Sequence, residues 1–117
     1  MIVYLYHFRN GRYGYERKGT FVRPRHYCGV TATSFAQRDK EHRSGRGAAF
    51  TREFSYRRGI AMKPVWKYEC HSDDARRLER ALKNRKSLSV FCPICNPQGN
   101  EKAFLRLLGK LNIDIPY

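Results

Sequence analysis

The sequence predicts a small α+β domain in which helices pack on a short sheet that begins with an antiparallel hairpin. The length of 117 residues suits one domain. Segments with strand and helix patterns follow one another in the order β, β, α, α, β, α. Eight Tyr and seven Phe residues supply a core in a chain that is otherwise highly charged.

The first two strands flank a basic segment. Residues 2–8 are β-branched and aromatic, and the turn signal Asn10-Gly11 follows them. Residues 26–31 have the composition of a second short strand. Between them, residues 12–25 combine arginines and lysine with two glycines and a proline, which is typical of an extended hairpin loop or insertion.

Helix signals follow the second strand. Ser34 precedes Gln37 by three residues, the spacing of a capping box, which predicts a helix from Phe35 to about Arg43. A further helix is expected over residues 48–58, ended by Gly59.

The rest of the chain should add one strand and two helices. Residues 60–70 form the third strand, in which Pro64 suits an edge position or a bulge. Ser72, as a cap, and two following acids predict a helix that runs to about Lys86. Residues 103–111 form a final amphipathic helix.

The charge of the chain indicates a polyanionic partner. The 24 Lys and Arg residues against 10 Asp and Glu give a net charge of +14, which favours nucleic acid. A membrane surface is the competing interpretation, but no run approaches the roughly 18 apolar residues of a spanning helix. We find no targeting segment at the start, and we expect a soluble, intracellular protein with reduced cysteines.

Five polar residues interrupt or adjoin apolar patterns, and together they offer two phenols, a cation, an imidazole and a carboxylate. They are Tyr4, Tyr27, Arg38, His42 and Glu79. Arg38 and His42 are four residues apart and share one helix face, although a solvated basic helix would explain this pair equally well. Glu79 lies in the apolar stripe of its helix, where a carboxylate needs a cation or a salt bridge.

These groups suit metal-assisted hydrolysis of a phosphodiester. Glu79 could hold Mg²⁺ or Mn²⁺, since Mg²⁺ binds through few protein oxygens and keeps several waters. Arg38 could hold the phosphate in its planar fork. Tyr4 or Tyr27 could accept a proton from the attacking water if nearby cations favour the phenolate, with His42 relaying the proton or orienting the tyrosine.

The same residues resemble the motifs of the GIY-YIG nucleases over most of residues 2–95. Ile2-Val3-Tyr4 is similar to the first motif and Tyr27-Cys28-Gly29 to the second. Residues 37–42 are similar to the arginine and histidine helix of the family, residues 42–52 to the turn and threonine that follow it, and residues 78–83 to the helix with the metal-binding glutamate.

This resemblance implies a three-stranded antiparallel sheet and cleavage of double-stranded or branched DNA with one divalent metal. The products would carry 5′-phosphate and 3′-hydroxyl ends. Family members serve in repair, homing, restriction and branched-DNA resolution, so the pathway is left open. Residues 1–95 would form the nuclease domain with a basic insertion at residues 9–25, and residues 96–117 a loop and helix packed on the same domain.

The sequence departs from the family pattern in three places. Ile2 replaces the glycine of the first motif, and Cys28 takes the central position of the second. The longer gap between Tyr4 and Tyr27 makes residues 9–25 an insertion. An auxiliary asparagine stays unassigned between Asn84 and Asn96.

Contacts to DNA phosphates are expected from a set of cations on the insertion and around the active face. They are Arg12, Arg17, Lys18, Arg23, Arg25, Arg43, Arg46 and Arg52. We find no base-reading helix, so specificity would depend on DNA shape or on a protein partner.

The cysteines allow a separate metal site. Cys92 and Cys95 have the spacing of half a zinc knuckle, and Cys70 and His71 could complete a Cys₃His set. A reduced pair beside the core is the alternative. Two further hypotheses therefore stand beside the nuclease: a non-catalytic nucleic-acid-binding module, and a zinc-stabilised interaction domain.

Overall fold

The computed structural model describes residues 1–8, 15–17, 20–22, 25–57, 59–85 and 88–113. In chain order the elements are β1 (Ile2–Phe8), β2 (Tyr15–Arg17), β3 (Thr20–Val22), β4 (His26–Thr31), α1 (Phe35–Arg43), α2 (Ala49–Thr51), the π-helix η1 (Arg52–Arg57), β5 (Met62–Glu69), α3 (Ser72–Lys83), the 3₁₀-helix η2 (Ser89–Phe91) and α4 (Asn100–Lys110).

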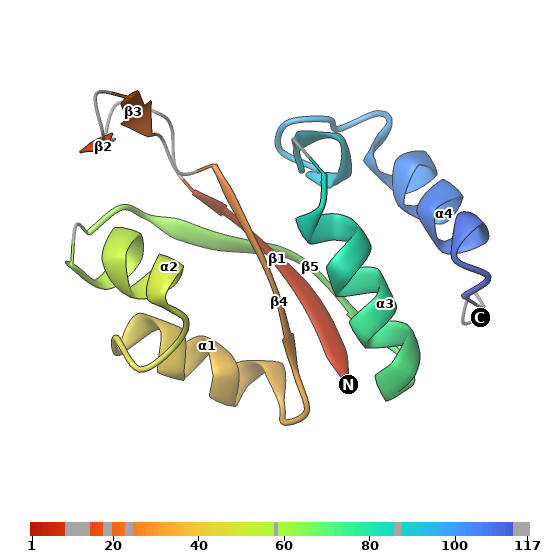
Figure 1. Cartoon of the computed structure of the whole chain (residues 1–117), viewed down its shortest axis with the longest axis horizontal. Helices are drawn as coiled ribbons and strands as arrows, with labels where there is room; N and C mark the ends of the chain where they lie inside the picture. The colour runs from red at the N-terminus through yellow and green to blue at the C-terminus, as the bar shows by residue number, and fades with distance from the viewer. Residues whose placement is uncertain (9–14, 18–19, 23–24, 58, 86–87, 114–117) are drawn as a thin grey trace.

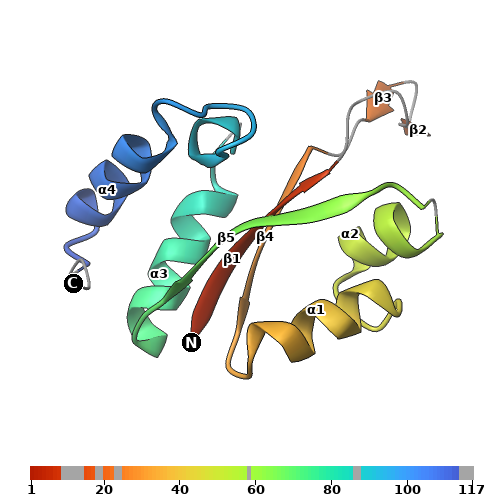
Figure 2. The same ribbon diagram turned by 180° about the vertical axis from the view of Figure 1, so that it is seen from behind.

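The sheet has three antiparallel strands in the order β4-β1-β5, so the predicted α+β architecture is confirmed. The helices α1 and α2 lie on one side of the sheet, and α3 and α4 lie on the other (Figures 1 and 2). Within the predicted basic segment, β2 and β3 pair as a separate antiparallel hairpin. None of the helices described here has the length and apolar character that a bilayer-spanning helix needs.

The central strand β1 contributes to two different cores because successive side chains point to opposite faces. Val3 and Leu5 belong to the core that includes residues of α3, whereas Tyr4, Tyr6 and Phe8 belong to the core that includes Phe54 of η1. These five side chains of β1 are each at most 1% exposed. The tyrosines are thus held on the face that α1 covers.

The C-terminal helix shares the first of these cores. Leu107 and Leu108 of α4 are buried in the same cluster as Val3 and Leu5. The segment that follows η2 therefore packs against the same sheet as α3.

The third strand contains the irregularity that Pro64 predicts. β5 is an edge strand, and its register against β1 shifts where Leu5 pairs with Trp66 but Tyr6 pairs with Pro64. A bulge at an edge accommodates a residue that has no backbone N–H to donate.

The predicted helix over residues 48–58 needs correction. Only Ala49–Thr51 is α-helical, and Arg52–Arg57 continues as a π-helix. Helix propensity and apolar spacing do not distinguish an i→i+4 from an i→i+5 hydrogen bond, so the sequence carried no signal for this change. Gly59 has a positive φ of 67° just beyond the helix, in line with its expected role as a terminator.

The helix caps are partly as predicted. Ser34 caps α1 by accepting the Gln37 N–H at 3.2 Å. Ser72, in contrast, is the first helical residue of α3 and His71 occupies the cap position without a side-chain hydrogen bond, so the predicted Ser72 cap is wrong. The α3 helix ends at Lys83, and α4 begins at Asn100, earlier than expected.

Candidate active site

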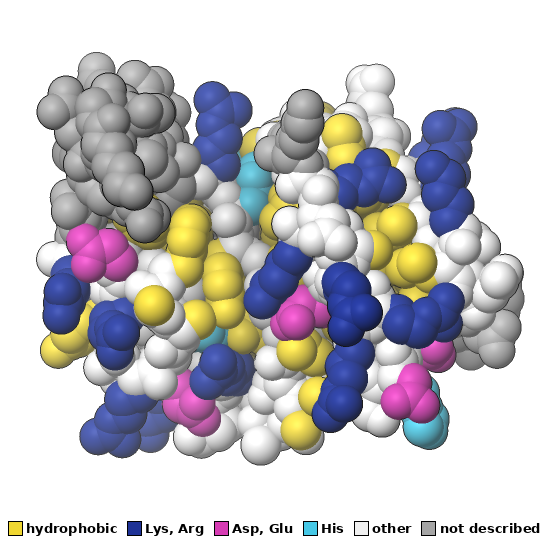
Figure 3. All heavy atoms as spheres, viewed as in Figure 1, with side chains coloured by type: hydrophobic (Ala, Val, Ile, Leu, Met, Phe, Trp, Pro, Cys, Tyr) yellow, Lys and Arg dark blue, Asp and Glu magenta, His cyan; other side chains and the backbone are white. Residues whose placement is uncertain are grey.

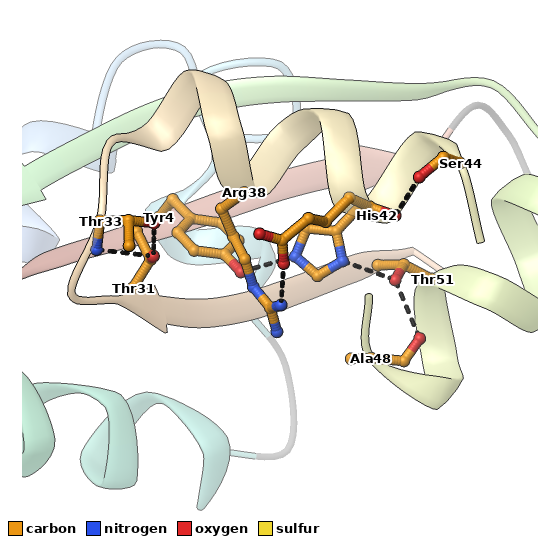
Figure 4. Close-up of polar contacts among 9 residues, drawn as sticks. Tyr4, Thr31, Thr33, Arg38, His42, Ser44, Ala48 and Thr51 are labelled. Carbon is orange, nitrogen blue, oxygen red and sulfur yellow. Dashed lines mark hydrogen bonds and ion pairs between the residues drawn. The ribbon is translucent and has the colours of Figure 1, made fainter. Parts of the chain in front are cut away.

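A buried chain of hydrogen bonds joins β1, α1 and α2 (Figure 4). The hydroxyl of Tyr4 lies 2.6 Å from Nε2 of His42, and Nδ1 of His42 lies 2.7 Å from Oγ1 of Thr51. The side chains of Tyr4, His42 and Thr51 are all 0% exposed. Three segments that are separate in sequence are therefore locked together through polar groups that have no access to water.

Thr51, at the end of this series of hydrogen bonds, determines which group donates and which accepts at each step. The hydroxyl of Thr51 donates to the carbonyl oxygen of Ala48 at 3.0 Å, so its oxygen must accept from His42 Nδ1–H. A neutral imidazole with its proton on Nδ1 has a free lone pair on Nε2, which accepts the hydroxyl proton of Tyr4. Burial, assisted by the charge of Arg38, lowers the pKa of His42 to about 4 and keeps the ring neutral.

Two glycines make room for this chain. A Cβ atom on Gly29 would lie 2.4 Å from the hydroxyl oxygen of Tyr4, which faces it across the β1–β4 pair. A Cβ atom on Gly47 would lie 2.1 Å from Nδ1 of His42. The glycine of the second motif is therefore explained by the close approach of Tyr4 to the backbone of β4.

Arg38 carries the positive charge of the site at the protein surface. Its side chain is 27% exposed and forms an ion pair with Glu41 at 2.9 Å. Burial raises the pKa of Tyr4, and a hydrogen bond to Arg38 together with its charge opposes that increase. The guanidinium is thus held between a carboxylate and a phenol, with part of its surface open to solvent.

Tyr27 of β4 is the second phenol of the site. Its ring centroid lies 6.5 Å from that of Tyr4 and 5.6 Å from that of His42, and the ring stacks on Phe50. Unlike Tyr4, Tyr27 is partly exposed. Burial, followed by the neighbouring Tyr4, raises the pKa of Tyr27 to about 12, although the charge of Arg38 acts in the opposite direction.

Glu79 approaches from α3, on the other side of β4. It is 23% exposed and has a long ion pair of 3.8 Å with Lys83. Its charge contributes to the raised pKa values of Tyr4, Tyr27 and Cys28, as expected for a carboxylate that lies near these three groups. The structure thus brings the five predicted site residues together around the edge strand β4, with α1 on one side and α3 on the other (Figure 1).

Glu79 also suits a divalent metal. Its side chain is partly exposed, and the ion pair with Lys83, at 3.8 Å, is long enough to leave the carboxylate available to a cation. Mg²⁺ typically takes one or two protein carboxylates and completes its shell with water, so one accessible glutamate fits that ion. Mn²⁺ accepts the same oxygen ligands.

Two further residues belong to this region, and neither was predicted as part of the site. Lys83 lies one turn after Glu79, with its Nζ 6.0 Å from the centroid of the Tyr27 ring. Asp39 accepts the hydroxyl of Tyr6 at 2.5 Å and pairs with Arg43 at 3.0 Å. In the sequence, Lys83 follows Glu79 by four residues and Asp39 precedes Arg43 by four, a spacing that allows ion pairs on a helix. Such pairs are frequent on any charged helix, so the spacing did not single out these two residues.

The described cations predicted to contact DNA are all exposed, and they are Arg25, Arg43, Arg46 and Arg52. Arg43 also donates to the carbonyl oxygen of Met62 at 3.0 Å, so it ties α1 to β5 as well. Lys and Arg side chains cover surface over both α1 and α3 (Figure 3). The remaining predicted cations are not all covered by the described residues. Arg17 is in β2, but its side chain is not described, and the other three are Arg12, Lys18 and Arg23, which lie outside the described residues.

The cysteines do not group as the sequence suggested. Cys92 and Cys95 lie beside His7 and His26, and the four ligand atoms are all within 4.8 Å of one another. The structure does not bring Cys70 and His71 to this cluster.

The β1 register explains this correction to the expected zinc ligands. Cys70 donates its N–H to Met1, at the opposite end of β1 from His7. Cys28 is buried at 3% exposure, as expected for a small core residue.

A comparison with known protein families adds an independent finding. The model of the family described as the GIY-YIG catalytic domain matches residues 3–89. This range begins within β1 and ends at the start of η2, so it contains Tyr4, Tyr27, Arg38, His42 and Glu79. Neither the curated proteins nor the solved structures contain a match.

Proposed function

The chain belongs to the GIY-YIG catalytic domain family, a family of nucleases, and we propose that it is a metal-dependent DNA endonuclease. It would hydrolyse phosphodiester bonds to 5′-phosphate and 3′-hydroxyl ends. The observation that carries the proposal is the arrangement of side chains around β4. The buried hydrogen bonds among Tyr4, His42 and Thr51 lie next to Arg38, which contacts Tyr4. Glu79 lies on the opposite side of the strand.

Arg38 is proposed to bind the scissile phosphate. Its guanidinium is partly exposed, and it is oriented by Glu41 and Tyr4, so little side-chain freedom is lost when it binds. The net charge of +14 would attract the DNA backbone to this surface.

We propose different roles for the two tyrosines because they differ in burial. Tyr4 is 0% exposed and bonded to His42, so we assign it to the positioning of Arg38. Tyr27 is partly exposed and is the phenol that a water molecule can approach. In this scheme the phenolate of Tyr27 takes a proton from the attacking water while the bond from phosphorus to the 3′ oxygen breaks, and the leaving oxygen takes a proton from solvent.

The metal ion would be held by Glu79. When bound there, it would offset the negative charge that develops on the phosphoryl and leaving oxygens. Lys83, beside both Glu79 and Tyr27, adds a fixed positive charge that favours the phenolate.

The two unusual motif residues are compatible with activity. Ile2 lies in the central strand, paired with Thr31 and Glu69, where a β-branched side chain is favourable. Cys28 fills a buried position opposite Leu5 on the face away from the phenols. These substitutions nevertheless keep open the alternative of a binding module without catalysis.

The test is cleavage of supercoiled plasmid and of branched DNA with and without Mg²⁺ or Mn²⁺. Cleavage should require the metal and should fall by about 100-fold or more in Glu79→Gln. Glu101→Gln, which removes an exposed carboxylate from α4, is the matched control and should cut like the parent.

Binding measured over a range of salt concentrations distinguishes the alternatives. An active parent and a Glu79→Gln variant that binds but does not cut would support the proposal. Salt-dependent binding by a parent that gives no metal-dependent product would support the binding module instead. Equal cleavage by Glu79→Gln and the parent would remove Glu79 from the mechanism.

A further inference from the structure

We propose that His7, His26, Cys92 and Cys95 form a structural Zn²⁺ site, separate from the catalytic metal site at Glu79. The ligand atoms are Nδ1 of His7, Nε2 of His26 and the Sγ atoms of the two cysteines. This inference does not depend on nuclease activity, because its evidence lies on other residues.

Four of the six distances between the ligand atoms match the edges of a zinc tetrahedron, and all six are within 4.8 Å. Bonds of 2.0–2.1 Å to nitrogen and 2.3 Å to sulfur require about 3.3 Å between two nitrogens and about 3.5 Å between nitrogen and sulfur. His7 Nδ1 and His26 Nε2 are 3.3 Å apart. Three of the four nitrogen–sulfur distances fit this geometry: His7 Nδ1 lies 3.5 Å from Cys92 Sγ and 3.6 Å from Cys95 Sγ, and His26 Nε2 lies 3.5 Å from Cys95 Sγ.

The backbone brings these residues together from three separate segments. His7 and His26 are direct partners across the β1–β4 pair, so their rings project from the same face. Strand alternation puts His7 on the face of Leu5, the same face on which Cys92 is buried. The loop after η2 reaches the end of β1 and β4 from which the β2–β3 hairpin extends (Figure 1).

The loop that holds the cysteines is fixed by its own hydrogen bonds. The N–H of Cys92 donates to Ser89 at 3.1 Å, and the N–H of Asn96 donates to Cys92 at 2.7 Å. The side chain of Asn96 donates to the carbonyl oxygen of Val90 at 2.9 Å and accepts from the N–H of Gly99 at 3.2 Å. Both cysteines are therefore positioned by a turn that has backbone and side-chain hydrogen bonds of its own.

The donor set selects zinc over the hard cations. Two thiolates and two imidazoles in a closed tetrahedron are typical of a structural zinc site, whereas Mg²⁺ prefers oxygen ligands. The two thiolate charges cancel the charge of Zn²⁺, so the complete site adds no net charge beside Arg25 and Lys63, which contribute positive potential at the two histidines. No covalent or redox step is involved.

Such a site would stabilise two parts of the fold at once. His7 and His26 border the chain segment that contains the β2–β3 hairpin, and Cys92 and Cys95 precede α4. Zinc would therefore join the base of that basic segment to the C-terminal segment. We expect it to contribute folding free energy, not catalysis.

The first test is the zinc content of untagged protein purified under reducing conditions and measured by elemental mass spectrometry. One zinc per chain is expected in the parent and in Cys70→Ser, whose cysteine lies outside the cluster. Cys95→Ser, at an exposed ligand position, should retain less than about one-tenth of the zinc. A parent without zinc, or an equal loss in Cys70→Ser, would overturn the proposal, as would a Cys92–Cys95 disulfide in its place.

The second test uses Co²⁺ in the chelator-treated parent, so it does not depend on a variant that folds. Tetrahedral coordination with intense visible bands and a thiolate-to-cobalt charge-transfer band is expected, and Zn²⁺ should displace it. A spectrum of octahedral Co²⁺ without the thiolate band would contradict the site. Removal of zinc should lower Tm by about 10 °C or more, and Mg²⁺ should not restore it.

Glu79→Gln separates this inference from the proposed nuclease function. This variant should keep one zinc per chain while it loses cleavage. Full zinc content in an inactive parent would support the zinc site and reject the endonuclease. Metal-dependent cleavage by a zinc-free parent would support the endonuclease and reject the zinc site.

Discussion

The phenol of Tyr4 in the central strand donates to Nε2 of His42 in α1 over 2.6 Å, with both side chains fully buried. This bond ties the sheet to the helix that carries Arg38. Because Thr51 fixes the tautomer of His42 from the other side, the proton positions are set by the fold before any substrate binds. The free energy of unfolding should therefore depend on these buried hydrogen bonds, and it can be measured separately from activity.

Thr51→Val should destabilise the protein. The valine removes the acceptor of His42 Nδ1–H and leaves a buried donor without its partner, which costs about 1–3 kcal/mol. Urea denaturation gives the change in the free energy of unfolding. Equal stability of Thr51→Val and the parent would mean that the hydrogen-bond chain is not formed in solution.

Thr33→Val is the matched control for this substitution. Thr33 is exposed, and its hydroxyl lies 2.9 Å from Oγ1 of Thr31, a contact that water can replace at the surface. The control should therefore stay within about 0.5 kcal/mol of the parent.

Gly29→Ala should displace Tyr4. The added Cβ atom would lie 2.4 Å from the hydroxyl oxygen of Tyr4, and the ring belongs to a packed core. We expect a loss of about 1–3 kcal/mol in stability and a lower rate of cleavage, since the contact between Tyr4 and Arg38 is disturbed. Gly109→Ala in α4 meets no atom within 4 Å and should be neutral or stabilising by up to about 1 kcal/mol. Similar effects of the two substitutions would argue against a steric role for Gly29.

His42 should make the protein sensitive to acid. Its pKa falls from 6.5 to about 4 on folding because the ring is buried. The unfolded chain then binds more protons than the folded chain between pH 6.5 and pH 4, so the free energy of unfolding falls as the pH falls through that interval. The contribution of this pKa shift to the free energy of unfolding is fully present above pH 6.5 and amounts to about 3 kcal/mol.

The measurement is the free energy of unfolding from pH 7 to pH 4.5 for the parent and for His42→Gln. The parent should lose more stability than the variant over this interval, because glutamine does not titrate. His71→Gln removes an exposed imidazole and should keep the slope of the parent. The same slope in all three proteins would show that His42 is not held neutral by the fold.

The strands and first helix were predictable because their local signals are strong. Residues 2–8 and 26–31 are short runs of strand-forming residues, and Ser34 marks the start of α1, so the predicted bounds agree with β1, β4 and α1. The change from α2 to the π-helix was not predictable, since side-chain periodicity does not report which carbonyl an N–H selects.

Contacts between distant segments were harder to predict. Tyr4 and His42 share a motif resemblance, which indicated that they meet. His7 and His26 had no such guide, because the cross-strand register cannot be read through the basic segment between them. Cys70 and His71 directly precede the helix before Cys92, which made them candidate ligands, but the antiparallel course of β5 carries them to the other end of the sheet.

The proposed roles of the tyrosines can be separated by the pH dependence of cleavage. With its pKa raised to about 12, Tyr27 is mostly protonated at neutral pH, and its phenolate fraction increases about tenfold per pH unit below that value. The cleavage rate under single-turnover conditions should therefore rise with a slope near one in a plot of log rate against pH from about 7 to 9. Ionisation of a metal-bound water could produce the same slope, so the variants decide.

Tyr27→Phe should lose about 100-fold or more in rate and should also lose the slope, because the group that titrates is gone. Tyr4→Phe should cleave more slowly than the parent but keep the slope, since the buried phenol acts through Arg38 and does not take up the proton. DNA affinity should be similar in both variants, because the cations proposed to contact phosphate are unchanged. If the slope persists in Tyr27→Phe and disappears in Tyr4→Phe, the roles are reversed, and Arg38 must move aside during the reaction to admit water to Tyr4.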